Sequence, residues 1–257
     1  MTVGSAYASP VSESRPLVVL PTYNEAENLD AVLDRILADA PGFDVLVVDD
    51  ASPDGTGAMA DARAARNSRI HVLHRPGKEG LGRAYVAGFR WGLAAEAGYT
   101  HLCEMDADLS HDPADLPRLL AATRPEGADA DLAIGSRYIE GGSISGWGLG
   151  RRVLSRGGGL YAKTLLGLPV EDPTSGFRCF RRNVLETLAL DDVECHGYGF
   201  QIEMTLRVAQ AGFRIVEVPI HFTDRTRGTS KMDARIAVEA ATFVLRLRLR
   251  RGRRRAR

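Results

Sequence analysis

The sequence has few of the features that mark a disulfide-bonded or membrane-spanning protein. Its three cysteines, Cys103, Cys179 and Cys195, are odd in number and show no Cys-x-x-Cys spacing, which argues against a disulfide framework and a cysteine zinc site. The longest apolar runs, such as Val45–Val48, are far shorter than the ~20 residues of a membrane-spanning helix. With 44% hydrophobic and 26% charged residues, the chain has the composition of a soluble globular protein, and we expect a reducing, cytoplasmic setting.

Two glycine-rich nucleotide-binding fingerprints are also missing. The dinucleotide pattern G-x-G-x-x-G must follow the first strand directly, whereas the first strand expected here runs into Pro21-Thr-Tyr23. Gly55-Thr-Gly57-Ala-Met-Ala60 is a weak match in the wrong place, and no P-loop pattern occurs. A hydride-transfer enzyme and a P-loop enzyme are therefore disfavoured.

Charge is unevenly distributed, although 33 basic residues balance 33 acidic ones. Eight of the basic residues are arginines between Arg246 and Arg257, a segment without an acid, so the body of the chain is acidic. A positive field confined to one end is a poor basis for nucleic-acid binding. It suits an anionic membrane surface, or it is a solvated tail with no partner.

Short apolar runs alternate with segments of helical spacing from Pro16 onward. Because these runs lack polar alternation, we expect strands covered on both faces, in a mostly parallel, Rossmann-like α/β sheet with helices on both sides. Asn24, with Glu27 three residues later, predicts a capping box at the first helix. We expect a disordered segment at 1–15, one domain at 16–245 and a basic tail at 246–257. The expected strands are residues 17–20, 45–48, 70–73, 102–105, 132–134, 177–180 and 215–218.

Acidic side chains follow several of the expected strands, where α/β sheets bind their ligands. Asp106-Ala-Asp108 directly follows residues 102–105. At a strand end, residues two apart point the same way, so both carboxylates can face one cation. Ser110, two residues further, adds a hydroxyl, and Mg²⁺ or Mn²⁺ prefers such oxygen ligands. Asp129-Ala-Asp131 has the same form, but it precedes its strand and is expected to be solvated.

Other polar residues at these ends suit a nucleotide. Asp50 is placed for a hydrogen bond to a ribose or base, or it belongs only to the turn that follows. Glu25 either contacts the nucleoside or favours the N-terminus of the next helix. Basic residues that could hold phosphate oxygens by bidentate contacts are Arg137, Arg151, Arg152, Arg225 and Lys231.

Taken together, these blocks resemble the polyprenol (dolichol) monophosphate mannose synthases, which are inverting GT-A glycosyltransferases of family two. The resemblance runs from about residue 16 to 245 and rests on the blocks as a set. They are Pro21-Thr-Tyr-Asn-Glu-Ala-Glu-Asn28, Val48-Asp-Asp-Ala-Ser-Pro-Asp-Gly-Thr56, Gly80-Leu-Gly-Arg-Ala-Tyr85, Met105-Asp-Ala-Asp-Leu-Ser-His111, Gly135-Ser-Arg-Tyr138, Ser175-Gly-Phe-Arg178, Asp224-Arg225 and Ser230-Lys231.

The resemblance implies transfer of mannose from GDP-mannose to a polyprenyl phosphate with Mg²⁺ or Mn²⁺. It implies that Asp106, Ala107 and Asp108 hold metal and diphosphate, with Ser110 at a metal position, and that Arg151 meets the lipid phosphate. Arg137 is expected to contact the donor and acceptor phosphates. The implied guanosine-binding residues are Pro21, Tyr23, Glu25, Val48 and Asp50, and the further donor-phosphate residues are Arg225 and Lys231.

Physical chemistry makes this reaction reasonable for these residues. A phosphate monoester has its second pKa near ~6 and is largely dianionic at neutral pH, so no histidine base is needed, and His74, His111 and His221 are expected to be structural. The catalytic set is then Asp108, which would hold the metal ion, with Arg137 and Arg151; the metal ion and the two arginines supply the positive charge. Because membrane helices are missing, we expect a peripheral protein held by its basic tail or by a membrane partner protein. Two alternatives stay open: a polyprenyl-phosphate glucosyltransferase using UDP-glucose, and a regulatory subunit without turnover.

Overall fold

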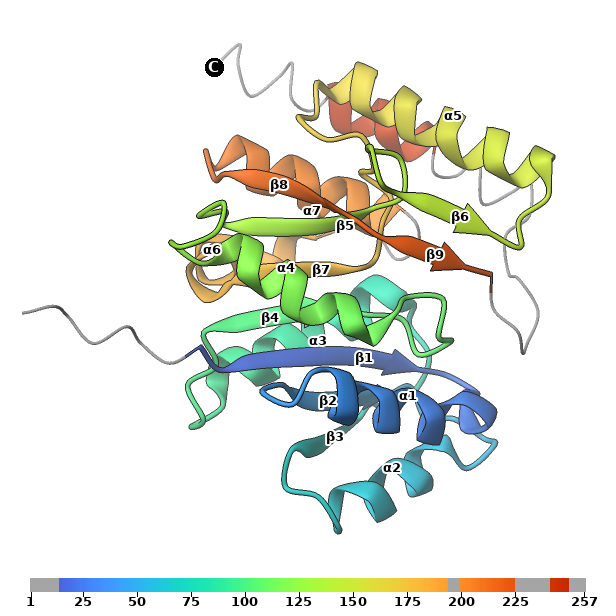
Figure 1. The fold of residues 1–257 in the computed structure, drawn as a ribbon, viewed down its shortest axis with the longest axis vertical. Helices are drawn as coiled ribbons and strands as arrows, with labels where there is room; N and C mark the ends of the chain where they lie inside the picture. The colour runs from blue at the N-terminus through green and yellow to red at the C-terminus, as the bar shows by residue number, and fades with distance from the viewer. Residues whose placement is uncertain (1–13, 194–198, 225–240, 250–257) are drawn as a thin grey trace, which may run out of the picture.

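The computed structural model describes residues 14–193, 199–224 and 241–249, and its centre is a seven-stranded sheet (Figure 1). The strand order is β3-β2-β1-β4-β7-β5-β8. Only β7 runs antiparallel to its neighbours within this sheet, pairing with β4 on one side and β5 on the other. The predicted mostly parallel α/β fold is confirmed. The strands are β1 (Pro16–Thr22), β2 (Asp44–Asp49), β3 (Ile70–His74), β4 (His101–Glu104), β5 (Leu132–Ser136), β7 (Arg178–Arg181) and β8 (Ile215–Pro219).

Helices cover both faces of the sheet, as the buried strands require (Figure 1). Alternate residues of β1 point to opposite faces: Val18 and Leu20 join one buried cluster, Leu17 and Val19 the other. The first cluster includes α1 (Ala26–Asp39), α2 (Thr56–Ala64) and α4 (Leu116–Thr123). The second includes α3 (Leu81–Ala94), α6 (Arg182–Thr187) and α7 (Gly199–Gln210). Two short 3-10 helices, η1 (Pro113–Asp115) and η2 (Leu190–Asp192), complete the connections.

A separate two-stranded sheet lies next to the carboxyl ends of β5 and β8 (Figure 1). β6 (Ser143–Ser145) pairs in parallel with β9 (His221–Thr223), and the long helix α5 (Leu149–Leu166) follows β6. Residues 241–249 are helical and pack against the second cluster through Val244. The hydroxyl of Tyr161 on α5 donates to the carbonyl of Ala241 at 3.4 Å, so the two helices touch. The basic segment from Arg246 therefore begins inside a helix.

The predicted capping box at the first helix is wrong. α1 begins at Ala26, after Glu25, and Asn24 has a left-handed backbone with φ of 59°. The Ala26 N–H donates instead to the Asp54 carboxylate at 3.1 Å. This acceptor lies in the loop after β2, which tertiary packing places beside the loop after β1. Sequence spacing within the helix could not reveal it.

Candidate active site

The loops that follow β1, β2 and β4 come together at the carboxyl edge of the sheet. β1 and β2 end side by side, with Thr22 in register with Asp49. Each of the three loops holds one non-glycine residue with positive φ: Asn24, Ala51 and Leu109, at 59°, 53° and 60°. Such conformations cost about 1 kcal/mol or more each and tend to collect at functional sites. Backbone strain thus marks the edge that the acidic motifs predicted.

The Asp106–Ser110 loop carries the expected metal ligands. The side chain of Asp106 is 36% exposed and accepts a hydrogen bond from the Tyr85 hydroxyl at 3.3 Å. Asp108 is buried and accepts from the backbone N–H of Ser110 at 3.0 Å, which shapes a tight turn. Ala107 is buried in the core, so it can meet a ligand only through its backbone. All side-chain atoms of this loop that could bind a metal ion are oxygens, the ligand type that Mg²⁺ or Mn²⁺ prefers.

These two carboxylates and one hydroxyl are a small ligand set. Within the described ranges, no group of three or more His, Cys, Asp or Glu side chains is gathered for a metal ion. A cation here would therefore take its remaining ligands from water and from substrate oxygens, which is how Mg²⁺ usually binds beside phosphates. The donor set fits a cation that arrives with a nucleotide.

A buried ion pair lies behind this loop. Glu104 ends β4, two residues before Asp106, and its carboxylate is 3.9 Å from the Arg178 guanidinium, both side chains being 0% exposed. Burial raises the pKa of Glu104 to about 7, with Arg178 acting in the opposite direction. Arg178 also donates to the carbonyls of Ser175 and Pro173 at 2.7 and 3.0 Å. Its guanidinium thus ties the loop before β7 to the strand that carries the aspartates.

His111 behaves as the sequence predicts for a structural histidine. Its ring is 3% exposed and lies against Phe177, with ring centres 4.9 Å apart. Burial lowers the pKa of His111 to about 4, so the ring is neutral at neutral pH. Its Nδ1 accepts a long bond, 3.4 Å, from the Asp106 backbone N–H.

The residues expected to hold a guanosine are not equally available. Tyr23 is partly exposed and carries the Lys78 ammonium 4.1 Å from its ring centre. Pro21 lies within β1, and Val48 is 0% exposed in the core between β1 and β3, so no atom of Val48 is exposed to a ligand in this structure. Glu25 is partly exposed and accepts from the Asn28 amide at 2.9 Å.

Asp50 has a partner that sequence reasoning missed. The Arg75 guanidinium, just beyond β3, binds the Asp50 carboxylate with one amino group and Glu79 with the other. Burial raises the pKa of Asp50 while Arg75 opposes that shift. A lone arginine after a strand carries no sequence signal for this pairing, because 25 residues separate the two partners. Arg75 thereby places Asp50 at the edge of the site.

The two arginines expected at the acceptor phosphate are both held by carboxylates. Arg137 is buried against Asp172, and Arg151 in the first turn of α5 contacts Asp224 at 2.9 Å. Both guanidinium groups also lie against one indole ring, that of Trp147. Neither Asp172 nor Trp147 was singled out from the sequence, although Trp147 stands in the glycine-rich segment 140–150 and Asp172 three residues before the Ser-Gly-Phe-Arg block.

Three further basic residues have different outcomes. Arg152 is exposed and donates to the carbonyl of Ile144 at 2.8 Å, which supports a local role at the surface. Arg225 and Lys231 lie outside the described residues, so their expected place at the donor phosphates stays a prediction. The last described residue before them is Asp224, the partner of Arg151.

Comparison with known proteins identifies the class. The model of glycosyl transferase family 2 matches residues 17–189. The chain therefore belongs to glycosyl transferase family 2, and the resemblance that its sequence blocks suggested is confirmed.

Two curated relatives are similar over nearly their whole length. The chain is 53% identical over 232 residues to the undecaprenyl-phosphate mannosyltransferase of Micrococcus luteus, covering 90% of this chain and 93% of the relative. It is 52% identical over 219 residues to the polyprenol monophosphomannose synthase of Mycolicibacterium smegmatis, covering 85% and 81%.

Solved structures show the same fold at lower identity. Glucosyl-3-phosphoglycerate synthase from Mycobacterium tuberculosis, in a complex with Mn²⁺ and UDP, matches with a TM-score of 0.66 and 22% identity, covering 92% of this chain and 80% of that chain. A mannosyltransferase from Pyrobaculum calidifontis, bound to GDP-Man and Mn²⁺, matches with a TM-score of 0.58 and 20% identity, covering 86% and 59%. These likenesses support the predicted GT-A fold.

Proposed function

We propose that this protein transfers mannose from GDP-mannose to a polyprenyl phosphate, giving polyprenyl phosphate β-mannose and GDP. The observation that carries the proposal is that Arg137, which shares the Trp147 ring with Arg151, lies within electrostatic reach of Asp106 in a family 2 glycosyltransferase fold. The names of the two relatives at 52% and 53% identity support both the sugar and the lipid acceptor.

The site suits an acceptor that needs no base. A phosphate monoester is already largely dianionic at neutral pH, and His111, the histidine nearest the aspartates, is buried and neutral. One phosphate oxygen attacks C1 of the mannose, the bond from C1 to the GDP oxygen breaks, and the electron pair leaves with GDP. Attack from the opposite face turns an α-linked donor into a β-linked product. The task of Arg137 and Arg151 is to offset repulsion between two anionic substrates.

A divalent cation, Mg²⁺ or Mn²⁺, fits the donor set described above. Asp106, Asp108 and Ser110 would hold it beside the donor diphosphate. When bound, such an ion stabilises the negative charge of the departing nucleotide. Pro21, Tyr23, Glu25 and Asp50 would bind the guanosine part, with Val48 supporting them from the core.

We further propose that the protein works as a peripheral membrane protein on the cytoplasmic face. Within the described ranges, no helix is sufficiently long and apolar to cross a bilayer. Eight large hydrophobic side chains of those residues are exposed, and seven of them lie on α5 or residues 241–249. We call these seven the outer apolar face: Leu149, Val153, Leu154, Leu160, Tyr161, Leu245 and Leu249.

Charge supports the same orientation. Neither α5 nor residues 241–249 contain an aspartate or glutamate, whereas α5 carries Arg151, Arg152, Arg156 and Lys163. Basic residues near an anionic leaflet contribute roughly 1 kcal/mol each. Arg151 lies two residues from the exposed Leu149 and from the exposed Val153, on the opposite side of α5, so a helix resting on the bilayer would keep this arginine within about one helix diameter, ~10 Å, of the lipid headgroups.

Turnover of defined substrates tests the proposal. Purified protein is incubated with Mn²⁺, a polyprenyl phosphate and radiolabelled GDP-mannose or, in a parallel reaction, radiolabelled UDP-glucose, and the label extracted with the lipid is measured. We expect label in the lipid phase from GDP-mannose alone, and a rise in melting temperature with GDP and Mn²⁺ but not with UDP. Transfer only from UDP-glucose would establish the glucosyltransferase, and no transfer from either donor would favour a subunit without turnover.

A further inference from the structure

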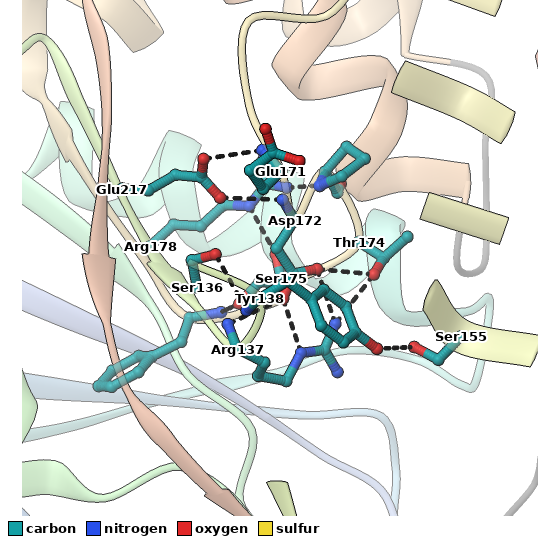
Figure 2. Close-up of polar contacts among 12 residues, drawn as sticks. Ser136, Arg137, Tyr138, Ser155, Glu171, Asp172, Thr174, Ser175, Arg178 and Glu217 are labelled. Atoms are coloured by element: carbon teal, nitrogen blue, oxygen red, sulfur yellow. Dashed lines mark hydrogen bonds and ion pairs between the residues drawn. The ribbon is translucent and has the colours of Figure 1, made fainter. Parts of the chain in front are cut away.

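The guanidinium of Arg137 is fixed by one edge. Its Nε and Nη2 donate to the two carboxylate oxygens of Asp172 at 2.7 and 2.8 Å, and Nη2 also donates to the Thr174 hydroxyl at 2.9 Å (Figure 2). The side chains of Arg137 and Asp172 are 8% and 0% exposed. Within the described part of the chain, the remaining nitrogen, Nη1, has no hydrogen-bond partner. The edge of the guanidinium formed by Nε and Nη2 is therefore bound to Asp172, and Nη1 is left to bind a ligand.

Asp172 is itself held from several directions. Its carboxylate also accepts from the Arg137 backbone N–H at 3.2 Å and from the Thr174 hydroxyl at 2.9 Å. Its backbone N–H donates to Glu217 on β8 at 2.9 Å, and the other Glu217 oxygen accepts from the Glu171 N–H at 2.7 Å (Figure 2). One carboxylate on a rigid strand thus clamps two successive peptide groups.

The far side of the same loop is tied by Arg178, which donates to the carbonyls of Pro173 and Ser175 (Figure 2). The loop 171–175 is therefore hydrogen-bonded to β8 through Glu217 and to the start of β7 through Arg178. Both strands belong to the central sheet, so the position of Asp172 is set by the core of the protein.

Electrostatics keep the pair ionised. Burial by itself would lower the pKa of Arg137, but Asp172 more than reverses this, and Asp106 adds to the increase. Burial would raise the pKa of Asp172, and Arg137 outweighs it, so this pKa lies below its ordinary value. The contribution of Asp106 also shows that the Arg137 guanidinium lies within electrostatic reach of the expected metal loop.

We propose that Asp172 is a positioning residue of the transfer reaction: it orients the guanidinium of Arg137 toward the substrate phosphates, and Glu217 in turn orients Asp172. The inference rests on the proposed function, because it takes a phosphate as the ligand of Arg137. A free arginine side chain loses about 2 kcal/mol of rotamer entropy when it is fixed. Here the protein fixes it before the substrate arrives, so little of that cost is left to binding.

Asp172→Asn gives the direct test. Asparagine has the same size, but its amide NH₂ faces a guanidinium N–H donor, so one of the two bonds is lost and the charge is removed. The matched control is Glu171→Gln on the same loop, because the Glu171 side chain turns to Lys163 and only its backbone meets Glu217. Initial rates are measured while polyprenyl phosphate and GDP-mannose are varied separately, together with melting temperatures and the shift caused by GDP and Mn²⁺.

We expect Asp172→Asn to raise the KM for polyprenyl phosphate and to lower kcat/KM for that substrate at least about tenfold. The melting-temperature shift with GDP and Mn²⁺ should fall much less than the acceptor kcat/KM, because Asp50 and the Asp106 loop still hold the nucleotide when Arg137 is misoriented. Glu171→Gln should remain within about twofold of wild type. If Asp172→Asn lowers kcat only in proportion to the folded fraction, with both KM values unchanged, the ion pair is purely structural and the proposal is wrong.

Two further variants keep the test decisive should Asp172→Asn fail to fold. Glu217→Gln leaves the ion pair intact and weakens only its support, so a smaller rise in the acceptor KM is expected. Arg137→Lys removes the planar guanidinium that Asp172 orients. Because Glu217 acts through Arg137, adding Glu217→Gln to Arg137→Lys should cause little further rise in the acceptor KM. Losses that simply add in the double variant would overturn the proposal. Wild-type turnover tests the proposed function separately. The variants are assayed with the donor that the wild-type protein uses, GDP-mannose or UDP-glucose. If the wild-type protein uses neither donor, both the proposed function and the role of Asp172 are wrong.

Discussion

The guanidinium carbon of Arg151 lies 4.2 Å from the ring centre of Trp147. The guanidinium carbon of Arg137 lies 5.6 Å from the same ring. One buried indole therefore contacts both cations that are expected to meet the acceptor phosphate, and such cation–π contacts contribute about 0.5–2 kcal/mol each. The ring is in turn packed edge-on against Phe222, with centres 5.2 Å apart. Trp147 thus links the acceptor arginines to β9.

Replacing this ring should affect the acceptor more than the donor. We expect Trp147→Leu to raise the KM for polyprenyl phosphate about five- to tenfold, with a much smaller change in the KM for GDP-mannose. Trp147→Phe keeps an aromatic face and should recover part of the loss. Steady-state kinetics with each substrate varied check this, and equal increases in both KM values would contradict it.

The metal assignment is tested by a comparison of two Asp-Ala-Asp motifs in the same chain. Asp108→Asn should lower mannosyl transfer at least about a hundredfold and abolish the Mn²⁺-dependent part of the stabilisation by GDP. Asp129→Asn is the control, because Asp129 is largely exposed and paired with Arg181, and asparagine tolerates its positive φ of 51°. We expect it to behave as wild type in both assays. Retained activity in Asp108→Asn would remove Asp108 from the metal site.

The outer apolar face should mediate membrane binding. Val153 is 64% exposed on α5, and Val153→Asp introduces a charge that a bilayer interface disfavours and an anionic lipid repels. Deletion of residues 246–257 removes the eight arginines at the C-terminal end of the sequence. Either change should reduce sedimentation with vesicles containing anionic lipid at low salt. Leu81→Asp is the control, because Leu81 is the exposed large hydrophobic residue on α3, away from this face. Sedimentation that none of these changes affects would exclude this face.

Acid should destabilise the fold through His101. Burial, together with Arg181 and Arg124, lowers the pKa of this side chain to about 4. The unfolded chain takes up the proton near the ordinary value of 6.5, whereas the folded protein resists it, so stability present at neutral pH is lost as the pH falls through this interval. From pH 7.5 to pH 5 the loss amounts to about 2 kcal/mol. His101→Gln should remove that part of the pH dependence in urea unfolding, and an unchanged difference between the two pH values would contradict the assignment.

The positions of the seven strands of the central sheet, though not of β6 and β9, and the acidic motif at the end of β4 were predictable from the sequence. Apolar runs without polar alternation identify buried strands, and the Asp106-Ala-Asp108 motif stands at the end of β4 as expected. Trp147 and Asp172 were not predictable as parts of the site. Asp172 is 35 residues from its partner Arg137, and Trp147 lies in an irregular segment before α5, where no periodicity predicts which arginine its ring meets.

Local signals also failed where a distant group competed with them. Asn24 and Glu27 have the spacing of a capping box, yet Asp54 provides the acceptor for the first turn of α1. Leu245-Arg-Leu-Arg-Leu-Arg250 alternates with period two, a pattern that by itself leaves helix and strand open, whereas residues 241–249 are helical and bury Val244 against the core. In both places, packing between segments outweighed a pattern that spans only a few residues.

By itself, then, the sequence determined a layered α/β architecture and the residue types gathered at one sheet edge, because burial on two faces and the alternation of a strand are properties of neighbouring residues. The tertiary structure alone decided which carboxylate holds each arginine, which groups stay charged when buried, and where apolar side chains remain exposed. Those outcomes depend on distances between atoms that the chain brings together only on folding, and electrostatic energies in a buried site change steeply with such distances.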